Sequence, residues 1–101
     1  MDVFYSGTVN LEKTDLLYGS LENINDWILK KIEVSSLTEE TNLKLFYNDN
    51  IVFDESITLD SLDENKTITF EVDLGVGEHI LQGTSDISGI RLVLYVEETP
   101  K

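Results

Sequence analysis

Apolar and polar residues alternate with a period of two in several short segments of this chain. In the segment 66–73, Ile68, Phe70 and Val72 share one parity, and two threonines and two acidic residues occupy the other. Because successive side chains of a β-strand point to opposite faces of a sheet, this period predicts half-buried strands. We expect further short strands at 3–11, 27–36, 42–47, 51–53, 57–59, 78–82 and 90–97.

Turn-forming residues separate these segments at intervals of roughly 8–12 residues, which is typical of a sandwich or small barrel. The chain contains no Ala, the best helix former, and β-branched and aromatic residues take its place. No connection is long enough for a crossover helix, so neighbouring strands are expected to be antiparallel. The sequence therefore predicts an all-β fold, a single antiparallel, jelly-roll-like β-sandwich of about eight short strands. This domain is expected to cover residues 1–97, with a C-terminal tail at 98–101.

The segment 15–25 is open to two interpretations. Leu16, Leu17 and Leu21 could mark one turn of helix, or a short strand that breaks at Gly19. We therefore allow at most one short helix, near residues 15–25.

The segment 27–36 is expected to present two different faces. On one parity lie Ile28, Lys30, Ile32 and Val34. On the other, which we expect to point outward, lie Trp27, Leu29, Lys31, Glu33 and Ser35.

The segment 90–97 is apolar on both faces. Its inward parity holds Ile90, Leu92, Leu94 and Val96, whereas Arg91, Val93 and Tyr95 point outward. Such a strand is typical of the centre of a sheet or of a contact with another subunit. We therefore predict a homo-oligomer, with Trp27, Arg91, Val93 and Tyr95 as candidate interface residues.

Charge limits the partners that the chain is expected to bind. It carries 20 Asp and Glu against 7 Lys and Arg, a formal net charge of −13 over 101 residues. Phosphate backbones and anionic membrane surfaces attract basic residues, so we expect neither nucleic acid nor a membrane as a partner.

Few residues are available for catalysis or metal binding. The chain has no Cys and a single His, His79, which we expect at the surface or in an interface. The acidic run 60–65 could supply oxygen ligands to calcium, but it lacks the residue order of an EF-hand, and a solvated turn is the alternative. The run Asn48-Asp49-Asn50 is expected to form a hairpin turn, because Asn and Asp tolerate left-handed backbone conformations. We predict no enzyme activity, no catalytic residues, no metal site and no cofactor.

The C-terminal third has a defined order of residues. Leu74 precedes Gly77-Glu78, an apolar strand around Ile80, a Thr84-Ser85 loop and an alternating strand that ends at Glu97. This order resembles the closing pattern of small β-sandwich proteins of tailed-bacteriophage virions. The layout of 27–34 and of the 43–53 hairpin is similar to theirs as well, so the resemblance covers roughly residues 27–97. One departure is Glu78, where the pattern usually has Asp.

The resemblance implies a non-enzymatic structural or adaptor protein of the head decoration, tail or baseplate. Such proteins form trimers or rings and contact other virion proteins. Their location is the virion, and the host cytoplasm during assembly.

Two other functions stay open from the residues themselves. The charge would suit a small acidic inhibitor that mimics nucleic acid. Alternatively, Trp27 and a Tyr could form the stacking platform of a carbohydrate-binding module.

Overall fold

The structure is a computed structural model, which describes residues 2–19, 22, 24–35, 39–58 and 65–100. These residues form no helix, so the prediction of an all-β fold is confirmed. They form eight strands: β1 (Asp2–Val9), β2 (Thr14–Gly19), β3 (Asn25–Ser35), β4 (Thr41–Tyr47), β5 (Asn50–Ile57), β6 (Asn65–Gly75), β7 (His79–Ser85) and β8 (Ile90–Pro100).

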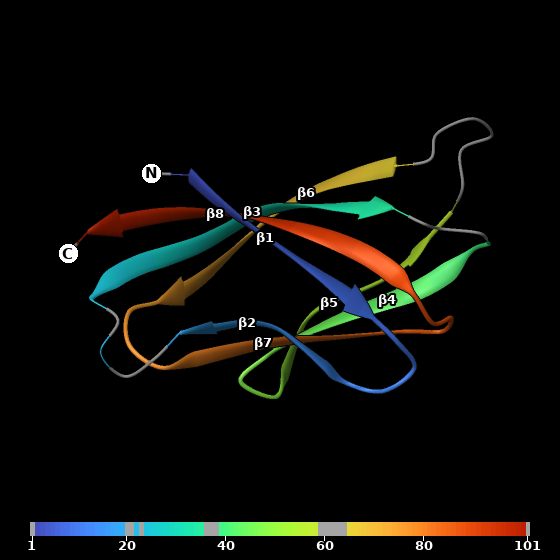
Figure 1. The fold of residues 1–101 in the computed structure, drawn as a ribbon, viewed down its shortest axis with the longest axis horizontal. Coiled ribbons are helices and arrows are strands. Elements are labelled where there is room, and N and C mark those ends of the chain that lie inside the picture. The colour runs from blue at the N-terminus through green and yellow to red at the C-terminus, as the bar shows by residue number, and fades with distance from the viewer. Residues whose placement is uncertain (1, 20–21, 23, 36–38, 59–64, 101) are drawn as a thin grey trace.

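The strands form two four-stranded antiparallel sheets that pack face to face (Figure 1). Sheet A has the order β1-β8-β3-β6, and sheet B has the order β2-β7-β4-β5. Of the connections between these strands, all but the β4–β5 hairpin pass from one sheet to the other. This strand order is that of a jelly roll, as predicted. The sandwich measures 43 × 25 × 17 Å, and both termini lie at the same end of it (Figure 1).

The core lies between the sheets and is built from alternate side chains of the strands. Leu92 and Leu94 of β8 and Leu43 and Leu45 of β4 are 0% exposed. All four inward residues predicted for the segment 90–97 are buried, and β8 lies at the centre of sheet A. Burying one such Leu side chain stabilises a fold by about 1.5–3 kcal/mol. The alternation in the sequence therefore identifies the residues that hold the sandwich together.

A β-bulge at Lys30 changes the inward face of β3. Leu29 and Lys31 pair with adjacent residues of β8, Val96 and Tyr95, so Lys30 opposes no residue there. One extra residue shifts the parity of all side chains beyond it. Before the bulge the odd positions therefore point inward, and after it the even positions do.

The predicted outward placement of Trp27 and Leu29 is wrong for this reason. Leu29 is fully buried, and Trp27 is partly buried and packs against the core. Ile32 and Val34, which follow the bulge, are buried as predicted. Strict alternation would place Lys30 on the same face as Ile28. One polar side chain on that face does not reveal in the sequence that a residue has been inserted.

A second irregularity explains the segment that the sequence leaves open. In β2 the pairing with β7 shifts between Asp15 and Leu17, so the intervening Leu16 is an extra residue. Leu16 and Leu17 are both buried, although they are adjacent in the chain. Two neighbouring inward leucines resemble a helical turn in sequence, whereas here they arise from a bulge in a strand. The short helix allowed near residues 15–25 does not form in the described part of that segment.

The turn between β4 and β5 is the predicted Asn48-Asp49 hairpin. Both residues have left-handed backbones, with φ of 47° at Asn48 and 69° at Asp49. Asn48 also joins the turn to β7. Its backbone N–H donates to the Ile80 carbonyl at 3.0 Å, and its side-chain oxygen accepts from the Ile80 N–H at 2.9 Å.

Two strands are longer than the sequence indicates. Residues 98–100, which we expected in a tail, continue β8 because they pair with residues 25–27 of β3. Strand β7 continues to Ser85 through Gly83, where we expected a loop. The predicted calcium-binding or solvated run 60–65 lies, in residues 60–64, outside the described residues.

Candidate functional site

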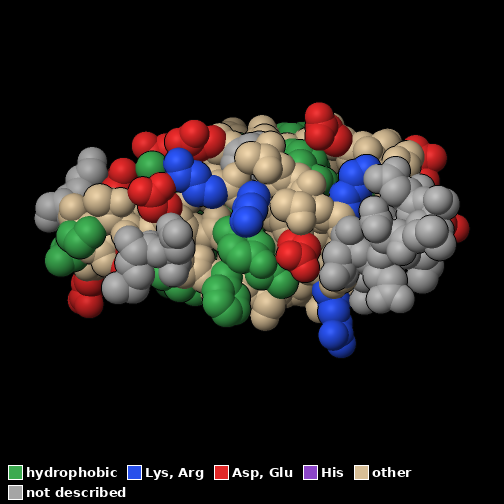
Figure 2. All heavy atoms as spheres, turned by 90° about the horizontal axis from the view of Figure 1, so that it is seen from above, with side chains coloured by type: hydrophobic (Ala, Val, Ile, Leu, Met, Phe, Trp, Pro, Cys, Tyr) green, Lys and Arg blue, Asp and Glu red, His purple; other side chains and the backbone are tan. Residues whose placement is uncertain are grey.

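The outer face of sheet A carries the candidate functional residues. Because side chains alternate along each strand, Phe4 of β1, three residues of β8 and Lys31 of β3 all point away from the core. The three residues of β8 are Arg91, Val93 and Tyr95. Figure 2 views the molecule from the side of sheet A and shows hydrophobic side chains near the middle of this face, with Lys and Arg side chains around them.

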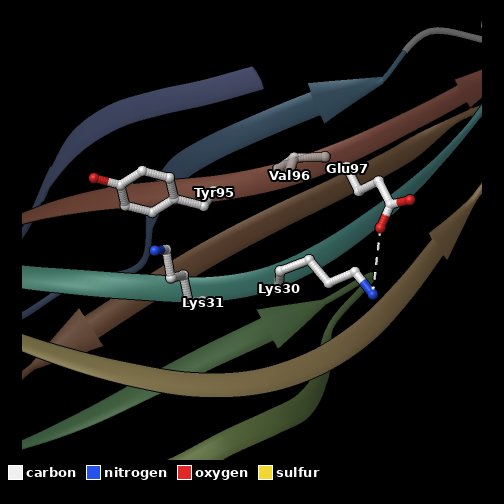
Figure 3. A pocket seen from close by; sticks show the side chains of 5 residues that line it. All are labelled: Lys30, Lys31, Tyr95, Val96 and Glu97. Atoms are coloured by element: carbon white, nitrogen blue, oxygen red, sulfur yellow. Dashed lines mark ion pairs between the residues drawn. The ribbon is translucent and has the colours of Figure 1, made fainter. Parts of the chain in front are cut away.

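Two aromatic rings and an ammonium group form a surface cluster, which we call the Tyr95 patch (Phe4, Lys31 and Tyr95). Tyr95 lies directly opposite Phe4 on one side and Lys31 on the other. The ring centroids of Phe4 and Tyr95 are 6.2 Å apart, and their planes are tilted by 39°. Lys31 Nζ lies 4.6 Å from the centre of the Tyr95 ring, a cation–π contact that Figure 3 shows from close by. Phe4 is 70% exposed, so the patch offers apolar area to a partner.

Charged groups border the Tyr95 patch on β3, β6 and β8. Lys30 Nζ forms ion pairs with Glu71 and Glu97, each at 3.3 Å, and these two carboxylates raise the pKa of Lys30. The Tyr95 hydroxyl donates a long hydrogen bond of 3.4 Å to Glu33. Desolvation and the Glu33 carboxylate raise the pKa of Tyr95 above its usual value, so the phenol keeps its proton to a higher pH than a free tyrosine does. A hollow of about 170 Å³ lies between these groups, lined by Lys30, Lys31, Tyr95, Val96 and Glu97 (Figure 3).

A polar groove adjoins the patch along β8. It has a volume of about 440 Å³, and we call it the Arg91 groove, after its only basic lining residue among those described. It is lined by Ser6, Gly7, Thr8, Ser35, Arg91, Leu92 and Val93. Three strands, β1, β3 and β8, therefore contribute to this groove.

The structure brings three of the four predicted interface residues together. Arg91, Val93 and Tyr95 follow one another on the outer side of β8, whereas Trp27 points toward the core. The Trp27 ring lies 5.7 Å from Tyr5 and 4.8 Å from His79. Its indole Nε1 is buried and makes no hydrogen bond with any residue that the structure describes. Trp27 is therefore not available as a flat stacking platform on the surface.

Two residues of the Tyr95 patch, Phe4 and Lys31, are not among the predicted interface residues, although Lys31 is predicted to point outward. The segment 3–11 carries a signal for Phe4, because Val3, Tyr5 and Val9 share one parity and Phe4 therefore lies on the opposite face. No such signal pairs Phe4 with Tyr95, since they are 91 positions apart and meet only through the register of β1 with β8.

His79 is buried, which corrects the prediction of a surface or interface histidine. Its side chain is 0% exposed, and neither ring nitrogen has a partner at full hydrogen-bond geometry among the described residues, although the Gly77 backbone lies near the ring. Trp27 meets the imidazole edge to face, and the Tyr47 ring lies 6.5 Å away. Burial lowers the pKa of His79, and the nearby Gly77 backbone opposes this shift to a smaller extent. The imidazole is therefore held neutral inside an aromatic cage.

No candidate metal centre is found in the described part of the chain. Within residues 2–19, 22, 24–35, 39–58 and 65–100, no group of three or more His, Asp or Glu side chains could hold a metal ion. Nor do these residues include a helix that is long and apolar enough to span a membrane.

Comparisons with known proteins identify the fold only. No family model and no curated protein matches the sequence. Several solved structures, the following three among them, share the fold at low sequence identity.

The first is the dimeric latent PorU of Porphyromonas gingivalis. It matches 95% of this chain at 11% identity with a TM-score of 0.54, and this chain spans only 11% of its length. The second is a chain of the acid-stable capsid of the Helicobacter pylori bacteriophage KHP30. It matches at 9% identity with a TM-score of 0.57, over 97% of this chain and 86% of that one.

The third is a family 35 carbohydrate-binding module of Clostridium thermocellum. It matches at 14% identity with a TM-score of 0.52, over 94% of this chain and 90% of that one. The resemblance to phage virion proteins is thus supported in part, since a capsid chain and a carbohydrate-binding module share this fold at similar length.

Proposed function

We propose that this chain is a non-enzymatic structural or adaptor protein of a bacteriophage virion. It assembles as a symmetric oligomer, a trimer or ring, through the outer face of sheet A. Its location is the virion, and the host cytoplasm during assembly. The Tyr95 patch is the observation that carries the proposal, because the 70% exposed Phe4 lies against a Tyr on the central strand of the sheet. Aromatic anchors of this kind are enriched in protein interfaces.

The comparison with the phage capsid chain supports the proposal at the level of fold and size. That chain and this one cover one another by 86% and 97%, so both consist of a single sandwich of similar length. Jelly rolls occur in viral capsids and also in lectin domains, so the fold alone does not choose between assembly and sugar binding.

Light scattering coupled to size-exclusion chromatography tests the proposal. We expect the wild-type chain to form one discrete oligomer, and we expect Phe4→Ser and Tyr95→Ser to convert it to a monomer. Tyr18→Ser is the matched control, because Tyr18 is 60% exposed but lies on β2 of sheet B, and it should leave the oligomer intact. A wild-type chain that stays monomeric at the highest attainable concentration contradicts the proposal.

Carbohydrate binding is the second candidate function, favoured by the same exposed aromatic pair. Two features of the Tyr95 patch count against it. The Phe4 and Tyr95 rings are tilted by 39°, whereas successive sugars stack best on coplanar rings, and Lys31 already lies over the Tyr95 ring. A glycan array separates the two functions. If the protein is a monomer and binds a glycan specifically, and if Tyr95→Ala abolishes that binding, the result would favour the carbohydrate-binding module.

Mimicry of nucleic acid receives less support from the structure. A mimic needs its carboxylates concentrated on one surface. Here exposed or half-exposed carboxylates lie on sheet A at Glu33 and Glu71, on sheet B at Asp15 and Asp54, and in turns at Asp49. This distribution fits the solvated exterior of a sandwich.

A further inference from the structure

The Arg91 groove is hollow because short side chains surround a long one. Thr8 and Ser35 lie directly opposite Arg91 on the two neighbouring strands. Gly7 lies on the inward parity of β1, where a Cβ would come within 2.8 Å of Leu16, so only the short side chains of Ser6 and Thr8 face outward beside Arg91 on this strand. The outer surface is therefore depressed beside the guanidinium, and the depression is about 440 Å³ in volume.

The chemistry of the groove is opposite to that of the molecule as a whole. The chain has 20 acidic and 7 basic residues, yet none of the described residues lining this groove is acidic. Arg91 is exposed and makes no ion pair with a described residue. Glu33, which lies opposite Val93, contacts the Tyr95 hydroxyl.

These groups match a carboxylate. A guanidinium presents a planar fork of N–H donors that binds both oxygens of a carboxylate at once. The hydroxyls of Ser6, Thr8 and Ser35 add donors that can rotate toward the same group. An apolar wall at Val93 would exclude water from one side of the contact.

We propose that the Arg91 groove binds an acidic side chain of a second copy of this chain. Charge complementarity supports this occupant, because a chain of net charge −13 offers exposed carboxylates, such as Glu55 on the edge strand β5 of the opposite sheet. Contact between sheet A of one copy and an acidic edge of the next is head-to-tail, the type that closes into rings.

Continuity with the Tyr95 patch supports the same occupant. Arg91 and Tyr95 are four residues apart on one strand, about 13 Å. A typical interface covers about 800 Å² per partner, which spans both sites. The inference rests on the proposed function, since it assigns the polar half of the same assembly surface.

The test compares self-association of the full chain with that of Arg91 variants, by sedimentation equilibrium in low and in moderate NaCl. We expect Arg91→Gln to weaken association at least tenfold, and Arg91→Glu to weaken it further. Arg91→Lys, which keeps the charge but loses the fork, should be intermediate. Raising NaCl should change the affinity more favourably in Arg91→Gln than in the wild-type chain. Salt screens the repulsion between two acidic copies in both proteins, but it screens the Arg91–carboxylate attraction in the wild type alone.

Tyr18→Ser on β2, the edge of sheet B away from β5, is the control, and circular dichroism checks that each variant is folded. An oligomer that is unchanged in Arg91→Gln and Arg91→Glu overturns the groove inference and leaves the proposed function standing. A wild-type monomer overturns both. A monomer that binds polygalacturonate only when Arg91 is present assigns the groove to an acidic sugar instead and also overturns the inference.

Discussion

His79 is an imidazole in the interior of the sandwich whose ring nitrogens have no well-formed hydrogen bond with the part of the chain that the structure describes. An unpaired polar group in such a place costs roughly 1–3 kcal/mol, and a charged one would cost more. The ring is retained by contacts: Trp27 packs on its edge, and Gly19 of the neighbouring strand leaves just enough room for it. The histidine and its glycine therefore form a unit, and both can be tested by substitution.

Acid should destabilise the fold through His79. Because burial lowers its pKa in the folded state, the unfolded chain, with a pKa of about 6.5, binds the proton more readily. The contribution of the neutral imidazole to the free energy of unfolding is therefore fully present above about pH 6.5. It falls as the pH drops toward the pKa of His79 in the folded state, by at most about 1.4 kcal/mol per pH unit. Urea unfolding between pH 5.5 and 8, followed by the fluorescence of the single Trp, measures this slope.

The matched variants for that measurement are His79→Gln and His79→Phe, which do not titrate. We expect the stability of whichever variant folds to be nearly independent of pH in the same range. Equal slopes in the wild type and in a folded variant would mean that His79 is not the titrating group.

Substitution of Gly19 by Ala should be costly, despite the small size of the added methyl group. A Cβ at this position would lie 2.3 Å from His79 Cε1 and 2.7 Å from each ring nitrogen. We expect Gly19→Ala to lower the free energy of unfolding by about 1–3 kcal/mol. In a His79→Ala background the same change should cost much less, so a double-mutant cycle by urea unfolding measures the coupling. Equal costs in both backgrounds would exclude the steric explanation.

At the scale of the elements, regular alternation is predictable and bulges are not. The segments 42–47, 66–73 and 90–97 became strands because hydrophobic side chains at every second position can be buried only in that conformation. At Lys30 and Leu16 an extra residue is accommodated by the register with β8 and with β7. Register is a property of two strands that are distant in sequence, so one segment read alone does not contain it.

The candidate site was predictable to the same extent. Arg91, Val93 and Tyr95 share a strand, and their parity alone places them on one face. Phe4, Lys31 and the hydroxyl groups of the Arg91 groove come from β1 and β3, which flank β8 only in the folded sheet. The sequence thus identifies the residues that β8 contributes to this surface, but not those that the neighbouring strands β1 and β3 contribute.

The β4–β5 turn offers a test of an element by itself. Asn48→Ala should lower the free energy of unfolding by about 1–2 kcal/mol, because Ala resists a left-handed backbone and loses the bond from the Ile80 N–H. Asn48→Gly keeps the backbone conformation and loses only that bond, so its effect should be smaller. Urea unfolding of the two variants ranks them, and a Gly variant less stable than the Ala variant would contradict the turn geometry.

For the whole molecule, net charge opposes folding, because compaction brings 20 carboxylates closer together than in the unfolded chain. The ion pairs of Lys13 with Asp49 and of Lys30 with Glu71 and Glu97, in the described part of the chain, are exposed and screened by solvent, so they offset little of this repulsion. Salt weakens both the repulsion among the carboxylates and the attraction within the ion pairs. Because acidic residues far outnumber basic ones, the weaker repulsion should have the larger effect on the free energy of unfolding.

We therefore expect salt to stabilise this protein. The free energy of unfolding should rise as NaCl is increased from about 10 mM to about 300 mM, where the Debye length falls from about 30 Å to less than 10 Å. Urea titrations on the Tyr95→Ser variant, at low protein concentration, separate this effect from assembly. Sucrose, which stabilises without screening charge, is the control for general solvent effects. A decrease in stability over the same range of NaCl would mean that the surface ion pairs outweigh the net repulsion, and the acidic exterior would then be a paired network instead of a solvated shell.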